Sequence, residues 1–475
     1  MFVKSFGAAK NVTGSCHLLT DEKDGSTVMV DFGLFQEREF EKKNYTLDFD
    51  PKNINYIVLT HAHIDHCGRI PFLIKNGFKG RIICTKPTYQ LSKVLLLDTG
   101  KIMSENYKYE LKKYLRRNEE KPRLLYDESD VLDSFDYFDP VLEYGKPYEL
   151  KNGFTVKAGN AGHILGSSFV KISKNGKSAI FSGDLGNKEK PIVKNFDYPE
   201  ESDIIYTETT YGDRNHKSFK ESKDEFLTAI TETLKNNGNV LIPSYATERA
   251  QDILYILREF YEQGLLPQCK VFLDSPLALN VTNIFVQNFS YFKDDEIPLF
   301  KKGDPFDFPY LNIVKDMEES KNINKINERA VIIAGSGMLH GGRILHHLKH
   351  NIWKTENALI FVGYQAKGTL GRKIVEGEEK VNILGEHYKV NAKIYTINGF
   401  SSHADQNELI EWINAGSGVN KGASKANNDV GHANPKYGKT CLVHGDEDVM
   451  NVYKGILEKK GFNVYIPSYG EEVGF

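Results

Sequence analysis

THAHIDHCGRIP, residues 60–71, carries the clearest indication of fold in this 475-residue sequence. It follows a short apolar run and places His61, His63, Asp65 and His66 within six residues. Imidazole and carboxylate groups are the usual ligands of zinc in hydrolases. On a turn that follows a strand, His61 and His63 project to one side, and Asp65 and His66 project to an adjacent position. The segment therefore predicts a site for two neighbouring metal ions, because a structural role rarely explains three clustered histidines.

Two metal ions need further ligands, and two later segments supply candidates. His163 lies in NAGHILGSS and Asp184 in IFSGDLGN, each just past a predicted strand. Alone, such a residue would more often be a cap or a turn residue, so the order of the segments along the chain carries the prediction. Asp31, in MVDFGLFQ, is expected to orient a ligating histidine and not to bind metal itself.

The segments VDFG, HAHIDH, AGHILGS and SGDLG together resemble those of the metallo-β-lactamase superfamily. The resemblance implies an α/β fold, the αββα sandwich. It implies two zinc ions that share a hydroxide, the nucleophile at neutral pH. The ligands carried over by resemblance are His61, His63 and His163 for one zinc, Asp65 and His66 for the other, and Asp184 as the bridge.

The last ligand of this fold is a histidine after a late strand, and His444 in TCLVHGDED matches it. It lies 260 residues beyond Asp184, so a domain must be inserted between them. Buried strands at residues 239–243, 270–273, 330–334 and 358–362 each lead into a loop and a helical pattern, which predicts a parallel sheet covered by helices. We expect the first part of the sandwich at residues 1–208, the insert at 209–371 and the second part at 372–475.

This layout resembles the β-CASP nucleases, in their compact form without added RNA-binding modules. Glu208 in YTETTYGDR and His403 in INGFSSHADQ match two further motifs of that family. By resemblance, His403 stabilises the phosphorane or protonates the leaving oxygen, Glu208 orients His403, and Asp65 belongs to the catalytic set as well as to the metal site. Alone, Glu208 would be an ordinary surface acid and His403 a residue at a helix start. Six residues in the insert or directly after it are candidate contacts for RNA phosphates or ordinary surface and turn residues: Ser275, Ser336, Arg343, Lys367, Gly368 and Arg372.

The expected function is a zinc-dependent ribonuclease that binds single-stranded RNA and cuts it internally. A 5′-to-3′ exoribonuclease of the same family stays open, because the motifs do not separate the two modes. A small-molecule hydrolase on the same fold is disfavoured by the large insert. A scaffold protein with a dead site is disfavoured because every ligand position is filled.

Composition sets limits on these expectations. The net charge of −3 counts mildly against a nucleic-acid binder, although bound metal ions supply positive charge at the site. Five unpatterned cysteines and the lack of a long apolar run predict a cytoplasmic protein with no membrane span. The sequence is compatible with a homodimer. Residues 101–128 are expected to form a solvated helix with a loop, and residues 415–439 a flexible polar loop.

Overall fold

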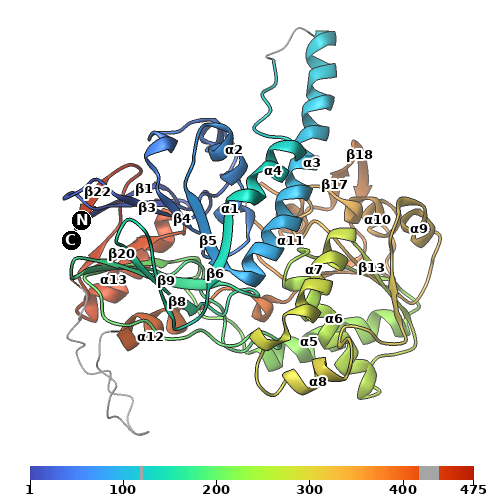
Figure 1. The fold of residues 1–475 in the computed structure, drawn as a ribbon. Helices are drawn as coiled ribbons and strands as arrows, with labels where there is room; N and C mark the ends of the chain where they lie inside the picture. The colour runs from blue at the N-terminus through green and yellow to red at the C-terminus, as the bar shows by residue number, and fades with distance from the viewer. Residues whose placement is uncertain (118–120, 367, 417–437) are drawn as a thin grey trace, which may run out of the picture. The chain divides into compact units, whose positions relative to one another are not determined.

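Two sheets of seven strands each form the core of one of the two units into which this computed structural model divides. The structure describes residues 1–117, 121–366, 368–416 and 438–475, and Figure 1 shows the fold. The first unit comprises Met1–Lys188, Asn195–Asn215 and His403–Phe475, and the second comprises Glu189–Lys194 and His216–Ser402.

The first sheet has the strand order β22-β1-β2-β3-β4-β5-β6, in which β3 to β6 run parallel. Its strands are β1 (Phe2–Gly7), β2 (Cys16–Thr20), β3 (Thr27–Val30), β4 (Tyr56–Val58), β5 (Arg81–Thr85), β6 (Phe138–Leu142) and β22 (Glu472–Gly474). On its outer face lie α1 (Ile64–Cys67), α2 (Ile70–Lys75), α3 (Lys86–Arg117) and α4 (Glu128–Ser134), with the 3-10 turns η1 (Glu41–Tyr45), η2 (Pro51–Asn53) and η3 (Phe135–Tyr137) nearby in the chain.

The second sheet has the order β21-β20-β11-β10-β9-β8-β7, in which β10, β11, β20 and β21 run parallel. Its strands are β7 (Pro147–Glu149), β8 (Thr155–Asn160), β9 (Ser168–Lys174), β10 (Lys177–Phe181), β11 (Ile204–Glu208), β20 (Lys439–Val443) and β21 (Val464–Tyr465). The helices α12 (Gln406–Gly416) and α13 (Glu447–Lys459) cover it through a cluster around the buried Trp412.

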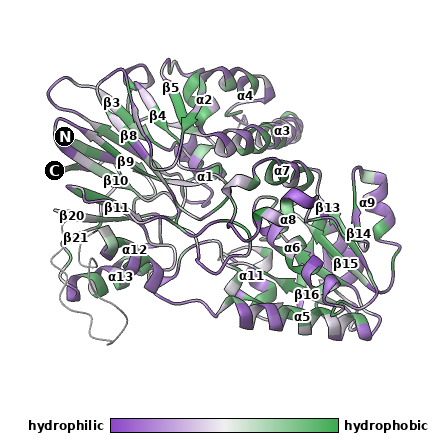
Figure 2. Ribbon diagram, turned by 60° about the horizontal axis from the view of Figure 1, so that its bottom comes forward, coloured by the Kyte–Doolittle hydropathy of each residue, from purple (hydrophilic) through white to green (hydrophobic). Residues whose placement is uncertain are grey.

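Apolar side chains of both sheets meet in one core. Val28 and Val58 of the first sheet belong to the same buried cluster as Val170 and Ile204 of the second. Separate clusters join each sheet to its own helices. The unit is therefore layered helix–sheet–sheet–helix, which confirms the predicted sandwich; Figure 2 shows hydrophobic residues along its strands.

The second unit is built on a six-stranded sheet, order β14-β13-β15-β12-β16-β19, in which every neighbouring pair is parallel. The prediction of a parallel sheet in the insert is thus confirmed. The strands are β12 (Val240–Pro243), β13 (Lys270–Asp274), β14 (Leu311–Ile313), β15 (Ala330–Ala334), β16 (Ala358–Phe361) and β19 (Lys393–Thr396), with a separate hairpin of β17 (Lys380–Ile383) and β18 (Glu386–Lys389). Its helices are α5 (Phe219–Lys235), α6 (Arg249–Glu262), α7 (Pro276–Gln287), α8 (Ile297–Lys302), α9 (Met317–Ile323), α10 (Arg343–Asn351) and α11 (Leu370–Val375), and its 3-10 turns are η4 (Phe289–Tyr291) and η5 (Asn398–Phe400).

The boundaries of the units differ in detail from the expected ones. The chain passes into the second unit at residue 216 and returns at residue 403, against expected boundaries after residues 208 and 371. A short excursion, Glu189–Lys194, also belongs to the second unit. The units are defined by compactness, whereas the predicted boundaries refer to family domains. Those boundaries therefore stay a prediction.

Two peripheral segments were expected to be polar. The helix predicted within residues 101–128 begins earlier, at Lys86, because Leu91 and Leu96 bury its first half against the first sheet. Residues 417–437, which make up most of the expected polar loop, lie outside the described residues. Within the described residues, no helix is long and apolar enough to span a membrane.

Candidate metal centre

The candidate ligands gather at one edge of the sandwich, where strands of both sheets end. His61 follows β4, His163 follows β8, Asp184 follows β10 and His444 follows β20. Carboxyl ends of strands that run in the same direction share one edge of a sheet, so residues distant in sequence meet there. The order and direction of the strands thus bring together candidate ligands from four separate segments of the sequence.

Four of these side chains surround one point. His61 Nε2 and His163 Nε2 each lie 3.1 Å from Nδ1 of His63. Oδ2 of Asp184 lies 3.5 Å from His61 Nε2 and 3.6 Å from His163 Nε2. These four atoms form one set of donors that could hold a metal ion.

A second set lies on the other side of the same carboxylate. Nε2 of His66 and Nε2 of His444 are 3.2 Å apart, and they lie 3.3 and 3.4 Å from Oδ1 of Asp184. Oδ2 of Asp65 lies 3.5 Å from His444 Nε2. Asp184 therefore presents one oxygen to each set, as the predicted bridging role requires.

The spacing of these donors fits metal ions of the size of zinc. Four ligand atoms about 2.0–2.1 Å from a tetrahedral zinc lie roughly 3.3 Å from one another. Most of the separations between neighbouring donor atoms fall close to this value. Asp184 Oδ1 is also buried with no hydrogen-bond donor. Such an acceptor is costly to bury unless a cation or donor satisfies it, so the residues fit a pair of metal ions.

Electrostatics hold the two carboxyl groups in the form that binds metal. Burial opposes the charge of Asp184, but His444, His66 and His61 outweigh it and keep its pKa well below the usual 3.8. For Asp65, burial is likewise outweighed, by a hydrogen bond from His444 and by nearby histidines, and the pKa falls to about 2. Both groups are therefore ionised at neutral pH, the state required of a metal ligand.

Asp31 contacts one of the histidines directly and a second through Thr60. Its Oδ2 lies 2.7 Å from Nδ1 of His66, which fits an N–H donating to a carboxylate that can only accept. The hydroxyl of Thr60 donates to the same carboxylate and lies 3.1 Å from Nδ1 of His61. Both rings thereby turn Nε2 toward the donor sets.

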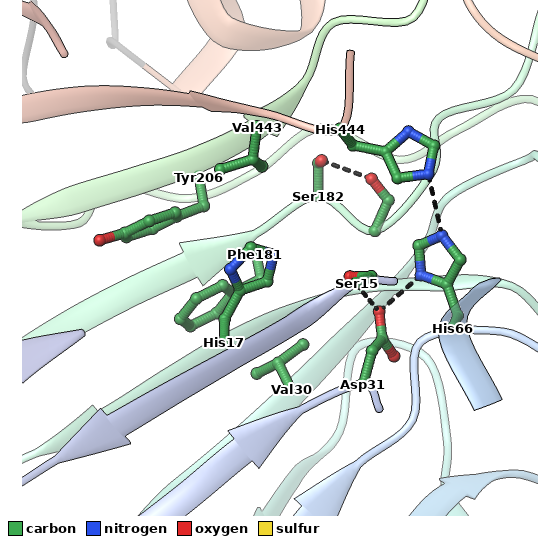
Figure 3. Close-up of a pocket in the computed structure, with 11 residues that line it drawn as sticks. Ser15, His17, Val30, Asp31, His66, Phe181, Ser182, Tyr206, Val443 and His444 are labelled. Carbon is green, nitrogen blue, oxygen red and sulfur yellow. Dashed lines mark hydrogen bonds and ion pairs between the residues drawn. The ribbon is translucent and has the colours of Figure 1, made fainter. Parts of the chain in front are cut away.

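A small cavity, about the size of one water molecule, lies beneath this network (Figure 3). Asp31, His66 and His444 line it on the side of the donor sets, and His17 lines it within the core. Nδ1 of His17 lies 2.9 Å from the hydroxyl of Ser5, and burial lowers the pKa of His17 to about 3. His17 is therefore a neutral core histidine at neutral pH.

Glu208 and His403 form a dyad beside the first donor set. Oε1 of Glu208 lies 3.2 Å from Nδ1 of His403 and also accepts from the backbone N–H of Leu185 at 2.7 Å. Burial disfavours a charged His403, but the charge of Glu208 and its hydrogen bond outweigh burial and raise the pKa above 6.5. Nδ1 of His403 is 4.0 Å from Asp184 Oδ2, and its side chain is 22% exposed, so the imidazole lies next to the donors and reaches solvent.

Glycine allows two of the ligand turns to approach closely. A Cβ on Gly33, in the VDFG segment, would lie 1.6 Å from the carbonyl oxygen of Asp65. A Cβ on Gly186 would lie 1.8 Å from the carbonyl oxygen of Gly162, next to His163. Both glycines are required by packing of one ligand-bearing turn against another.

The predicted phosphate contacts all belong to the second unit, and most have hydrogen-bond partners within that unit. Ser275 caps α7, and the Ser336 hydroxyl accepts from the backbone N–H of His340. Gly368 has a positive φ of 82°. Arg343 donates to buried Asp274 at 2.5 Å, Arg372 donates to Glu376 at 2.7 Å, and Lys367 lies outside the described residues. Binding of phosphate by these residues stays a prediction.

Several hydroxyl-bearing residues that were not predicted from the sequence also support the site. Thr60 links His61 to Asp31, and the hydroxyl of Thr210 lies 3.2 Å from Nδ1 of His444. The hydroxyl of Ser182 accepts from the backbone N–H of Glu208 at 2.9 Å. Each lies one or two residues from a predicted site residue in the sequence, so a hydroxyl close to such a residue was the available signal.

Known proteins resemble the chain over its whole length. Residues 10–243 match the model of the metallo-beta-lactamase superfamily, residues 250–374 that of the Beta-Casp domain, and residues 387–416 that of the Zn-dependent metallo-hydrolase RNA specificity domain. Ribonuclease TTHA0252 of Thermus thermophilus is 37% identical over 475 residues, which cover 100% of both chains. The chain belongs to the β-CASP family of metal-dependent hydrolases.

Other similarities agree with this family. Transcription termination factor FttA of Methanocaldococcus jannaschii is 30% identical over 488 residues, covering 98% of this chain and 70% of the relative. The crystal structure of a protein of unknown function from Enterococcus faecalis V583 matches with a TM-score of 0.54 at 12% identity, over 99% of each chain, and supports the fold alone. The β-CASP resemblance inferred from the motifs is therefore confirmed. The roles of individual residues stay predictions.

Proposed function

We propose that this β-CASP protein is a ribonuclease that holds two zinc ions and hydrolyses phosphodiester bonds within single-stranded RNA. One observation carries the proposal: the two oxygens of Asp184 face two separate sets of nitrogen and oxygen donors. A dyad of Glu208 and His403 lies beside one of these sets.

The proposed metal ligands are His61, His63 and His163 with Asp184, and Asp65, His66 and His444 with the same Asp184. Zinc held there supplies a Lewis acid and lowers the pKa of bound water to about 7. Asp31 and Thr60 keep the ring N–H groups of His66 and His61 turned away from the donor sets, so that Nε2 faces them.

His403 is the proposed general acid. Glu208 accepts from Nδ1 of His403 and favours its protonated form, so the imidazole can carry a proton at neutral pH. That proton is available for the 3′-oxygen that leaves when the P–O bond breaks. Glu208 acts only through His403, and its backbone N–H and carboxylate are held by Ser182 and Leu185.

RNA is the proposed substrate because of the relatives. One is a ribonuclease by name, another is a transcription termination factor, and residues 387–416 match a model named for RNA specificity. These similarities favour a ribonuclease over a small-molecule hydrolase on the same fold. A dead-site scaffold is disfavoured because every proposed ligand side chain is present and placed among the donors.

The decisive experiment is cleavage of end-labelled RNAs with 5′-hydroxyl, 5′-monophosphate and 5′-triphosphate ends. We expect internal fragments whose yield is independent of the 5′ end. Mononucleotides released only from the 5′-monophosphate RNA would instead assign the exonuclease mode. No RNA cleavage by a protein shown by elemental analysis to hold two metal ions, together with turnover of a thioester panel, would refute the proposal.

Location and oligomeric state stay predictions alongside this proposal. A cytoplasmic location rests on the five cysteines, all of them buried and free of disulfides. A homodimer remains to be measured by analytical ultracentrifugation.

A further inference from the structure

The second half of α3 extends away from the body of its unit (Figure 1). The first half is anchored by Leu91, Leu95 and Leu96, but no described residue from 101 onward in this helix is buried. We call residues 101–117 the α3 arm. It carries six lysines and arginines against two glutamates, a net charge of +4 in a chain whose net charge is −3.

The basic residues of the arm gather on one face. At about 100° per residue, Lys101, Lys108, Lys112 and Arg116 fall within an arc of about 80°, and they span about 22 Å along the axis. Exposed Glu105 lies in the same arc, so this face carries four positive charges against one negative charge. All four are exposed. Within the described residues, no acidic side chain pairs with Lys108, Lys112 or Arg116.

Large side chains flank this basic face without burial. Leu115 is 74% exposed, Tyr109 is 69% exposed and Ile102 is 49% exposed. The opposite face, with Met103 and Tyr107, is partly covered. A helix face that only interacts with water has no need of three exposed large apolar or aromatic groups, so the arm has the composition of a binding surface.

A polyanion fits this face better than a second copy of the chain. Two arms packed through their basic faces would bring like charges together, which is unfavourable. Phosphates would neutralise the cations, and exposed Tyr109 offers a ring on which an unpaired base can stack.

The arm is also connected to the metal centre through the start of its own helix. The hydroxyls of Thr85, just before α3, and of Thr88 donate to the carbonyl oxygen of Gly166, three residues from His163. By a rise of about 1.5 Å per residue, the basic face lies roughly 20–42 Å along the helix from Thr88. Only an RNA long enough to extend well beyond the cleaved bond can reach it.

We infer that the α3 arm is a binding surface for the phosphate backbone of RNA that extends beyond the metal centre. The inference rests on RNA as the substrate of the proposed function. It gives the protein a preference for long RNA that the metal centre alone does not supply.

The test compares two triple variants of the full-length protein. Lys108→Gln, Lys112→Gln and Arg116→Gln remove three charges from the arm, and glutamine keeps the helix propensity. The control carries Lys23→Gln, Lys52→Gln and Lys79→Gln, an equal change of charge at three exposed positions that precede strands, at the edge away from the metal centre. Circular dichroism checks that both variants are folded.

Binding of a long phosphorothioate RNA is measured by fluorescence anisotropy over a range of salt concentrations. Each lost phosphate contact reduces the slope of log K against log salt by about 0.7 for a single strand, so the arm variant should lose about 2. The control should keep the slope of the unmodified protein, and a hexanucleotide should bind all three proteins equally.

An unchanged slope in the arm variant, or an equal loss in the control, would overturn the inference. The measurement does not depend on cleavage. If the unmodified protein cuts no RNA but the arm variant still has a reduced slope, the proposed function is refuted and the arm remains a binding surface. Cleavage of RNA with an unchanged slope would sink only the arm.

Discussion

Substitution of Asp184 is the single change that tests both proposed metal sites at once. Each of its oxygens faces one set, at 3.5 and 3.6 Å from two imidazoles on one side and 3.3 and 3.4 Å on the other. Asp184→Ala removes one of four ligands from both proposed metal sites. Asp184→Asn keeps the shape and one carbonyl oxygen, so only one of the two sites should lose its ligand.

The expected loss follows from the number of ligands. A four-ligand zinc site contributes about 10–16 kcal/mol, so one ligand is worth roughly 2.5–4 kcal/mol, or roughly 70- to 900-fold in affinity. Asp184→Ala should lower the zinc affinity of both sites by this amount, and Asp184→Asn should lower that of one site. Asp31→Asn removes no ligand and disturbs the orientation of His66, so it should cost about 10- to 100-fold at one site.

The assay is competition between the metal-depleted protein and a chelator of known affinity, with zinc counted by elemental analysis. Asp133→Asn, an exposed aspartate outside the site, serves as the control for the change of charge. Two zinc ions bound by Asp184→Ala with unchanged affinity would refute the bridging role and the proposed pair of sites.

Three further outcomes are expected. His403→Ala should keep both zinc ions and lose about 10²–10⁴-fold in cleavage rate, with a smaller loss for Glu208→Gln. An RNA with an acidic leaving group should partly restore the rate of His403→Ala. Loss of zinc from that variant would instead make His403 a ligand. Burial and the charge of nearby Glu248 raise the pKa of buried Asp252 to about 7, above its unfolded value near 4, so folding favours the proton and stability falls as pH rises from about 4 to 7. Asp252→Asn should flatten this part of the profile of melting temperature against pH, and an identical profile would contradict the assignment. Trp412→Ala should lower the free energy of unfolding by about 3–5 kcal/mol in chemical denaturation, against less than 1.5 kcal/mol for an exposed site such as Trp353→Ala, because Trp412 is fully buried.

Short motifs with fixed chemistry were the most informative part of the sequence. His61, His63, Asp65 and His66 could be placed together because six consecutive residues on a turn have few arrangements. His444 could be attached to them only through the resemblance to a family. Nothing local in residues 439–444 indicates that β20 pairs with β11 and brings the histidine back to Asp184.

Other features depended on packing that a single sequence does not display. The early start of α3 at Lys86 follows from burial of Leu91 and Leu96 against the first sheet. Arg343 was a candidate for phosphate contact, but its partner Asp274 is 69 residues away in sequence, and only the fold shows the pair. Hydroxyl groups such as that of Thr60 were overlooked because threonine has no strong chemical signature of its own.

The parallel pairing of β11 with β20 joins Glu208 to Val443 across 235 residues of chain. During synthesis, β11 emerges long before its partner, and all of the second unit except Glu189–Lys194 is made in the interval. That unit's six-stranded sheet is complete by Thr396, so it can fold while the sandwich still lacks β20. His444 arrives directly after β20, so the second donor set is the last to form. Metal loading at that set is therefore expected to follow translation of almost the entire chain, and a nascent chain stalled earlier would lack His444 and with it the second donor set.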